Sequence, residues 1–427
     1  MQVERRKKHR PYHLMLFIYF IFAVFAFAID TPTEILSGLI QIVKSRSTLI
    51  SDYMAIGGIG ATLINASIVG AFSVLMQMAV GTRPNGSTLM AMFLSTGFAM
   101  QGKNILNMLP ITFGVWLYAR YKKEPLMNYT LAALLSATLS PAVSSFCFHP
   151  DLPPQVSFPL GIFMGVFIGF IFPPVSQATV RVHSGYSLYN MGFAGGLIST
   201  FIVSGFEAIG IRTENTVEWS TGNNLVLAIL LYAISAFLML YGLFASGELK
   251  LPPYRDMMKH SGRVLTDMLV LHGNSAYFNM GLLGAFSTTA MLLLGADLNG
   301  PTICGILTIM GFGAFGKHLR NVTPIMIGAI AATYVNKWDP RYPSNILAIL
   351  FSTGLAPIAG EFGWVWGIIT GFLHVNLMLH IGFLNSGLNL YNNGYASGFV
   401  VMFILPVILA LHRQAPYDKS RQKREEK

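Results

Sequence analysis

The stretch 97-GFAMQGKN-104 returns later in the chain as 311-GFGAFGKH-318. Both carry Gly-x-x-x-x-Gly-Lys, the start of the phosphate-binding P-loop, which continues with Ser or Thr and follows a strand. Here Asn104 and His318 stand in the hydroxyl position, and apolar sequence of helical character precedes both stretches. We therefore reject a nucleotide site and interpret the two stretches as copies of one segment.

The sequence reads as a tandem duplication. The shift that places Gly97 on Gly311 also places 70-GAFS-73 on an identical 284-GAFS-287. Two more segments match after small gaps: 134-LLSATLSPA-142 with 350-LFSTGLAPI-358, and 189-YNMGFAGG-196 with 391-YNNGYASG-398. We divide the chain into a basic N-terminal tail (1–11), a first membrane repeat (12–209), an inter-repeat loop (210–221), a second membrane repeat (222–412) and a charged C-terminal tail (413–427).

Composition predicts a membrane protein. Of the 427 residues, 53% are hydrophobic and only 11% are charged, less than half the roughly 25% that a soluble domain carries. Apolar runs recur along the chain at 12–29, 53–80, 158–172, 224–245 and 398–411. The longest of them reach the ~20 residues that a spanning helix needs. The expected fold class is an all-α polytopic membrane protein with roughly 10–14 transmembrane or re-entrant helices.

Several other classes of protein are disfavoured. The first apolar run, 12–29, is longer than the apolar region of a signal peptide and no cleavage site follows it, so we interpret it as a retained helix. Cys147 and Cys304 form neither a disulfide framework nor a metal-ligand spacing. The net charge of +10 comes from residues crowded at the termini and in a few loops, as in other membrane proteins. We expect no nucleic-acid partner, no cofactor and no metal.

Charge also predicts the direction of each half. Both tails are rich in Lys and Arg, which favours cytoplasmic termini for a multi-pass protein in the plasma (inner) membrane of a bacterium. The amphipathic connectors 32–52 and 248–267 correspond to each other, yet the first is neutral and the second basic. Corresponding loops on opposite sides require an odd number of crossings per half. We therefore predict two inverted repeats, each with about five full spans plus broken or re-entrant segments.

Two prolines interrupt corresponding apolar segments. Pro141 and Pro357 each remove a helical hydrogen bond and free backbone carbonyls one turn earlier. Hydroxyl side chains precede both: Ser136, Thr138 and Ser140 in the first half, and Ser352 and Thr353 in the second. Two interpretations stay open, namely a site for a small polar solute or ion, or a proline kink whose hydroxyls satisfy the freed backbone.

The lysines of the Gly-Lys stretches also allow two interpretations. Lys103 and Lys317 could anchor the ends of short helices, about 16 residues each, with their ammonium groups reaching the lipid surface. Alternatively, the short helices are re-entrant and carry both lysines inward. Together with Asn107 and Asn321 they would then form an anion-attracting vestibule, because an intramembrane cation is usually functional.

The remaining polar residues in apolar surroundings form two groups. We expect Asn65 and Asn279 to join helices to each other, and Asn190 and Asn392, which stand beside glycines, to face the transport path.

Glu361, His374 and His380 occur only in the second half, so they suggest a proton-coupling site or a structural hydrogen bond.

The duplicated Gly-Lys and Tyr-Asn-x-Gly motifs identify the whole chain as a member of an uncharacterised bacterial family of multi-pass membrane proteins, a domain of unknown function. That resemblance implies no substrate. More distantly, 65-NASIVGAF-72, 279-NMGLLGAF-286 and 190-NMGFAGG-196 resemble the Asn-Gly-x-x-Val-Gly segments of urea transporters, which are also inverted repeats. That family's second signature, Leu-Pro-x-x-Thr-x-Pro-Phe, is matched by 135-LSATLSP-141 without its first Pro and final Phe. Urea specificity is therefore not implied.

Taken together, the patterns predict a transporter or channel that moves a small polar solute or ion through a path between the two repeats. Its partners would be that solute and the lipid bilayer, and a homo-oligomer is compatible with the sequence. A membrane-embedded sensor or assembly scaffold is the alternative. An enzyme acting on lipid-linked substrates is less favoured, because such chemistry needs clustered carboxylates or histidines and the acidic residues here are scattered.

Overall fold

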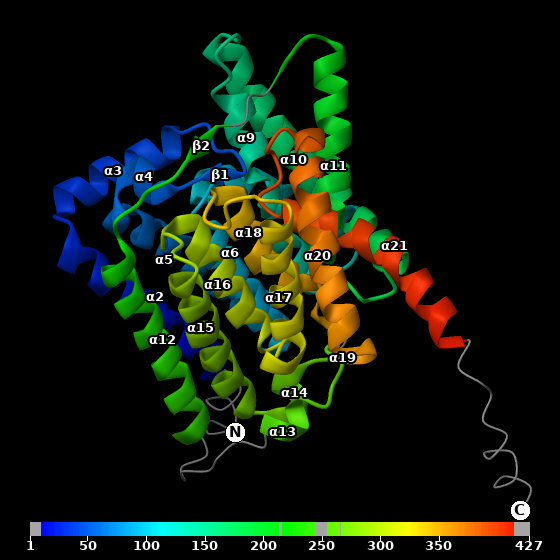
Figure 1. The fold of residues 1–427 in the computed structure, drawn as a ribbon. Helices are drawn as coiled ribbons and strands as arrows, with labels where there is room; N and C mark the ends of the chain where they lie inside the picture. The colour runs from blue at the N-terminus through cyan, green and yellow to red at the C-terminus, as the bar shows by residue number, and fades with distance from the viewer. Residues whose placement is uncertain (1–9, 213–215, 245–253, 265, 414–427) are drawn as a thin grey trace, which may run out of the picture.

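The computed structural model describes residues 10–212, 216–244, 254–264 and 266–413 (Figure 1). Apart from residues 10, 11 and 413, the predicted tails lie outside the described residues.

The first half is helical throughout. Its elements are α2 (Arg10–Ile29), α3 (Pro32–Lys44), β1 (Ile50–Ser51), α4 (Tyr53–Gly57), α5 (Ile59–Ala79), α6 (Gly86–Phe98), α7 (Ile105–Tyr121), the 3₁₀ turn η1 (Leu126–Tyr129), α8 (Thr130–Leu135), η2 (Ser136–Leu139), α9 (Ser140–Cys147), α10 (Pro154–Val182) and α11 (Asn190–Ala208).

The second half repeats this order. Its elements are β2 (Val217–Glu218), α12 (Asn224–Phe244), α13 (Tyr254–Met257), α14 (Met268–His272), α15 (Ser275–Leu293), α16 (Gly300–Phe312), α17 (Leu319–Val335), α18 (Pro343–Ser352), η3 (Thr353–Leu355), α19 (Ala356–Phe362), α20 (Trp364–Ile381), η4 (Gly382–Asn385) and α21 (Asn392–Arg413). Strands β1 and β2 pair in parallel over two residues and join the halves.

Ten helical segments in the described part of the chain are long and apolar enough to cross a membrane. They are Arg10–Ile29, Ile59–Ala79, Leu126–Cys147, Pro154–Val182, Asn190–Ala208, Asn224–Phe244, Ser275–Leu293, Pro343–Phe362, Trp364–Asn385 and Asn392–Leu411. The all-α class and the multi-pass prediction are therefore confirmed, and the number falls within the predicted range.

Two details of the predicted series differ from the structure. The short helices that flank the Gly-Lys turns are unequal, with 13 residues in α6 and in α16 but 17 in α7 and in α17. The amphipathic connector of the first half is confirmed as α3, whose start is capped by Thr31 and Glu34. In the described residues of the second connector, the only helix is the four-residue α13.

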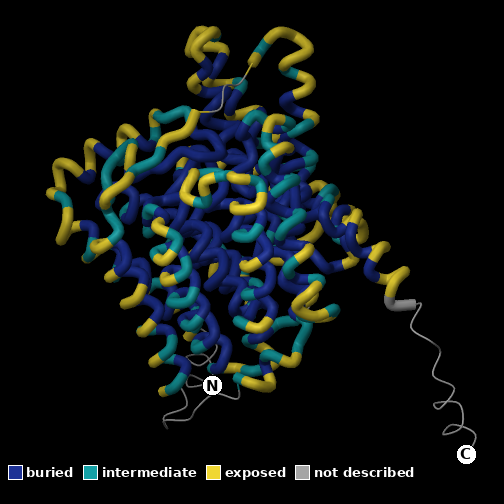
Figure 2. Tube along the Cα trace, in the orientation of Figure 1, coloured by how far each residue is buried: buried dark blue, intermediate teal, exposed yellow. Residues whose placement is uncertain are grey.

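Corresponding helices pair in the same way in each half. Helix α2 packs on α5 as α12 packs on α15, and α7 packs on α10 as α17 packs on α20. Two contacts then cross between the halves: α6 packs on α16, and α11 packs on α21. These four helices meet in the middle of the molecule, where nearly all residues are buried, while exposed residues follow the outer helices (Figure 2).

Helices α6 and α16 run antiparallel. The start of α16 at Gly300 lies against the carbonyl of Met100, just after the end of α6, and the start of α6 at Gly86 lies against the carbonyl of Ala314, just after the end of α16. The close approach leaves no room for a Cβ atom at either glycine.

An aspartate from the opposite half holds each of these helix starts. Asp52 accepts a hydrogen bond from the backbone N–H of Gly300 at 3.0 Å, and Asp267 accepts one from the N–H of Gly86 at 2.9 Å. A carboxylate is favoured at a helix N-terminus, where N–H groups lack helical partners. The same contact is thus built twice.

Replacing Asp52 with alanine is expected to lower the free energy of unfolding by about 2 kcal/mol or more, because the N–H groups of Met54, Ser220 and Gly300 lose their buried acceptor. The measurement is the melting temperature of the purified protein in detergent. Asp151→Ala is the matched control, since 83% of that side chain is exposed. Equal melting temperatures for the two variants would contradict the role given to Asp52.

Candidate functional site

The Gly-Lys stretches are helix ends followed directly by helix starts. Gly102 and Gly316 have positive φ angles of 70° and 105°, the conformation in which glycine commonly ends a helix. The backbone N–H of Lys103 returns to the carbonyl of Phe98, and that of Lys317 to Phe312. Asn104 and His318 then cap the next helix. The resemblance to a P-loop therefore comes from the glycine that turns the chain.

Asparagines lock both turns from two directions. Asn65 donates to the carbonyls of Ala99 and Lys103, and Asn279 donates in the same way to Gly313 and Lys317. The predicted helix-joining role of Asn65 and Asn279 is confirmed.

Asn107 and Asn321 also serve the turns. Asn107 accepts from the N–H of Asn104 and donates to Gly102 and Ser144. Asn321 accepts from His318 and donates to Gly316 and Ser261. Their amides are engaged in these bonds, so the predicted vestibule of two lysines and two asparagines is not formed.

Both lysines are buried, with exposed fractions of 1% for Lys103 and 0% for Lys317. The interpretation as anchors at the lipid surface is therefore wrong. It could not be excluded from sequence, because a lysine at the end of a short helix can extend outward or fold inward with the same neighbours in the chain.

The two lysines have different partners. Lys317 donates to the hydroxyl of Tyr189 at 2.5 Å and to that of Thr353 at 2.8 Å, and its ammonium group lies over the rings of Tyr189 and Phe312. Lys103 donates to the hydroxyl of Ser95 and to the carbonyl of Leu134, both at 3.2 Å. Within the described residues neither lysine has a salt bridge to a carboxylate.

The two proline-containing segments are broken helices. Each changes from α-helix to a 3₁₀ turn, η2 or η3, and resumes with Pro141 or Pro357 in the first turn of α9 or α19. All five predicted hydroxyl residues are buried. Ser140, Ser352 and Thr353 donate to carbonyls three residues earlier, as the structural interpretation predicts. The hydroxyls of Ser136 and Thr138 have no partner among the described residues.

Each break is completed by the opposite half. The N–H of Leu188 donates to the carbonyl of Gly354 in η3 at 2.9 Å, and the N–H of Leu390 donates to the carbonyl of Thr138 in η2 at 3.0 Å. These leucines directly precede the Tyr-Asn-x-Gly motifs. The carbonyls freed by the breaks thus bind backbone that lies far away in the sequence.

Five aromatic residues lie between the two breaks and form what we call the aromatic centre: Phe98, Tyr189, Phe312, Phe351 and Tyr391. The rings of Tyr189 and Tyr391 are 4.7 Å apart, and each lies 5.2 Å from a phenylalanine of the opposite half. Sequence reasoning missed these residues. The signal was present, because both tyrosines belong to the duplicated Tyr-Asn-x-Gly motif and two phenylalanines to the Gly-Phe that precedes each Gly-Lys.

The two asparagines of the Tyr-Asn-x-Gly motifs differ in their surroundings. Asn190 accepts from Thr179 and His183 and donates to the carbonyl of Ser176, so α10 engages its whole amide group. We expected a residue that faces the path, and this arrangement is instead a helix-to-helix junction. Asn392 accepts from Asn385, and its NH₂ group has no partner among the described residues.

The three residues considered for proton coupling do not share a site. Glu361 and His380 are exposed near opposite ends of α20. His374 is buried between them and contacts the side-chain oxygen of Asn393 at 3.0 Å, a hydrogen bond between α20 and α21.

A polar cavity of about 580 Å³ leads to Asn392 from the face of the molecule where β1 and β2 lie. Ser344, Ser386 and Gly382 contribute to its wall, together with the exposed carboxylate of Glu207. Because Asn392 follows Tyr391, this cavity brings solvent to the edge of the aromatic centre.

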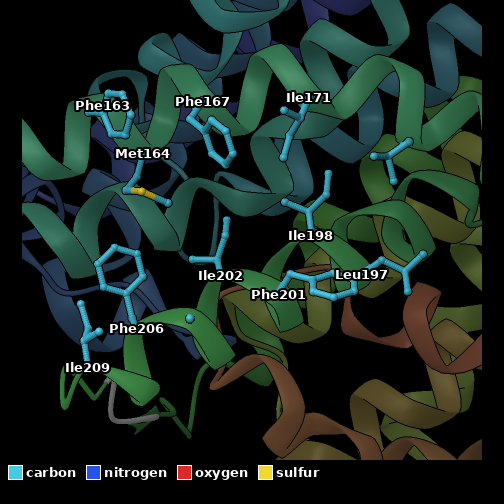
Figure 3. Close-up of a pocket in the computed structure, with 12 residues that line it drawn as sticks. Phe163, Met164, Phe167, Ile171, Leu197, Ile198, Phe201, Ile202, Phe206 and Ile209 are labelled. Carbon is cyan, nitrogen blue, oxygen red and sulfur yellow. The ribbon is translucent and has the colours of Figure 1, made fainter.

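A second cavity has a different character. It measures about 650 Å³, lies between α10 and α11, and is lined by apolar side chains such as Phe163, Phe167 and Phe201 (Figure 3). It offers no group that would bind a polar solute.

The family model described as a protein of unknown function (DUF1576) matches residues 31–208 and 248–410. The chain belongs to this family. The expected membership of a family of unknown function is confirmed, and the DUF1576 chain is a multi-pass membrane protein by the length and hydropathy of its helices. No curated protein and no solved structure matches it, so the resemblance to urea transporters gains no support.

Proposed function

We propose that the DUF1576 chain is a membrane transport protein that moves a small polar solute or ion between its two halves. One observation carries the proposal: two helices broken at corresponding prolines meet around two buried lysines, and each is completed by the other half. Irregular backbone at membrane depth is tolerated where it is buried in protein or lines a path, and solute sites in transporters commonly use such breaks. A purely structural kink gives no reason for uncompensated cations beside it.

The antiparallel packing of α6 on α16 supports an inverted repeat, since these helices correspond in sequence. In such folds the solute site lies where the repeats meet, and rocking of one repeat against the other opens it to each side in turn. The cavity that ends at Asn392 suits one of these two openings.

Charge supports cytoplasmic termini. The face where α2 begins includes the contacts of Tyr12 with Thr82 and of Arg263 with Ser184. Its loops are strongly basic and carry Arg10, Arg83, Lys122, Lys123, Arg255, Lys259, Arg263 and Arg320. The opposite face includes the contacts of Asp52 with Ser220 and of Trp219 with Asp297. It is rich in carboxylates, with Asp30, Glu34, Asp52, Asp151, Glu207, Glu218, Asp297 and Asp339. By the positive-inside rule, the first face is cytoplasmic.

Replacing Thr138 with valine is expected to lower solute flux roughly 10-fold or more without loss of folded protein, because the change removes one unpaired hydroxyl at the break and keeps the side-chain shape. The measurement is uptake into proteoliposomes from a panel of small solutes, with and without ion gradients. Thr288→Val is the matched control, since that hydroxyl is also buried without a partner among the described residues but lies on α15.

Unchanged flux in Thr138→Val would remove the break from the transport path. The absence of flux for every solute, with folded protein, would favour the alternative, a membrane-embedded sensor or assembly scaffold. An enzyme of lipid-linked substrates would be detected by turnover of such lipids in the same vesicles.

A further inference from the structure

We propose that the transported solute is a small anion, and that it binds between the ammonium group of Lys103 and the hydroxyl of Tyr391. The inference rests on the proposed transport function and names its class of solute. It follows from a difference between two half-sites that the duplication would otherwise make alike.

The two half-sites share one frame. Tyr391 packs on Phe98 as Tyr189 packs on Phe312, with 5.2 Å between ring centroids in both pairs. Each phenylalanine carbonyl also accepts the backbone N–H of the lysine that follows it, Lys103 or Lys317. Lysine and tyrosine are therefore presented from corresponding positions of the backbone.

In the second half the frame is closed. Lys317 donates directly to Tyr189 and to Thr353, and Thr353 in turn donates to the carbonyl of Leu350 at 2.7 Å. Tyr189 and Thr353 also lie within hydrogen-bond distance of each other at 3.3 Å. The lysine, the tyrosine and the broken helix therefore satisfy one another.

In the first half the frame is open, and one residue explains the difference. The position of Thr353 is occupied by Ala137, because 352-STG-354 aligns with 136-SAT-138. Without that hydroxyl, Lys103 donates straight to the carbonyl of Leu134, the counterpart of Leu350. The hydroxyl of Tyr391 then has no partner among the described residues, although it is fully buried.

The groups on this side are those that bind an anion. Lys103 uses two donors, toward Ser95 and Leu134, and an ammonium group has three. The hydroxyls of Tyr391, Ser136 and Thr138 can each donate as well. A buried cation without a carboxylate partner is unfavourable unless something compensates it. An anion would compensate Lys103 and accept from the hydroxyls, whereas a cation would be repelled by both lysines.

Access to this half-site favours a small solute. The polar cavity ends at Asn392, whose NH₂ group is a further donor without a partner among the described residues. Beyond it the residues of the aromatic centre are at most 2% exposed, so only a compact ion passes after a modest movement of side chains. A lipid headgroup, tied to its acyl chains, would not reach the site.

The test is anion binding to the purified full-length protein in detergent, titrated by calorimetry with nitrate, formate or sulfate in a buffer of large organic anions. Urea and sodium ions are the neutral and cationic probes. We expect at least one of the three anions to bind, and Tyr391→Phe to weaken its binding about 10-fold or more. The melting temperature without anion should not fall, because only an unpaired hydroxyl is lost. Tyr277→Phe, at a buried tyrosine of α15, should leave the affinity unchanged.

A second variant tests the same half-site by adding a group. Ala137→Ser should place a hydroxyl between Lys103 and Leu134, make the first half resemble the second, and weaken anion binding by a similar factor. Anion binding that neither Tyr391→Phe nor Ala137→Ser changes would overturn the inference. So would flux of urea or sodium without binding of any anion, although the transport function would then stand. Binding that both variants weaken, without flux of the bound anion, would uphold the site and reject transport.

Discussion

Replacing Lys317 with methionine is expected to abolish solute flux and to leave the protein folded. Lys317 connects Tyr189 to the broken helix at Thr353, and it is fully buried without a carboxylate partner in the described chain. Replacing a buried charge with an apolar side chain of similar volume is often neutral or stabilising, and methionine adapts to irregular space. The hydroxyls of Tyr189 and Thr353 can still bond to each other.

The expected loss of flux is roughly 100-fold, the effect of removing hydrogen bonds from a charged group at a working site. Proteoliposome uptake measures the flux, and the melting temperature in detergent measures stability. Lys259→Met is the control, because 72% of that side chain is exposed and both quantities should stay unchanged. A variant that melts well below the unmodified protein but retains flux would make Lys317 a structural residue.

Gly192→Ala is expected to lower the free energy of unfolding by about 2 kcal/mol or more. Helices α11 and α21 cross at this residue, where an added Cβ atom would lie 2.6 Å from the carbonyl oxygen of Tyr391 and 2.8 Å from the Cα atom of Gly394. Both are backbone atoms, so no side-chain rotation relieves the overlap, and the two helices must separate. Thermal unfolding in detergent measures the effect, and flux should fall as well because Tyr391 moves with its carbonyl.

Gly205→Ala is the matched control on the same helix. No atom lies within 4 Å of a Cβ atom built there, and alanine is a better helix former than glycine by about 1 kcal/mol. The control should therefore be as stable as the unmodified protein or more stable. Equal losses in the two variants would show that α11 tolerates no alanine at all, and that the crossing has no special role.

Much of the architecture can be predicted from sequence. Helix-forming apolar runs, the tandem duplication and the breaks before Pro141 and Pro357 all depend on residues close together in the chain, where local rules apply. The roles of Asn65 and Asn279 also followed from the general behaviour of buried amides.

The arrangement of the centre could not be predicted in the same way. Whether Lys103 and Lys317 extend outward or inward depends on which helices surround the Gly-Lys turns, and these come from distant segments. Asn190 and Asn392 occupy identical motifs, yet only the first has its whole amide group engaged, because α10 supplies Ser176, Thr179 and His183 at that place. Motif symmetry predicts equal environments, and tertiary packing made them different.

The exchange of backbone between the halves has a consequence for biosynthesis. The carbonyl of Thr138 waits for the N–H of Leu390, which the ribosome adds after almost all of the membrane helices have been made. During translation the first half can insert its helices one after another, but its broken helix keeps unpaired carbonyls until the second half arrives. Final assembly of the centre is therefore a late event, and a chain that stops before Leu390 would present the membrane quality-control proteases with an unfinished helix.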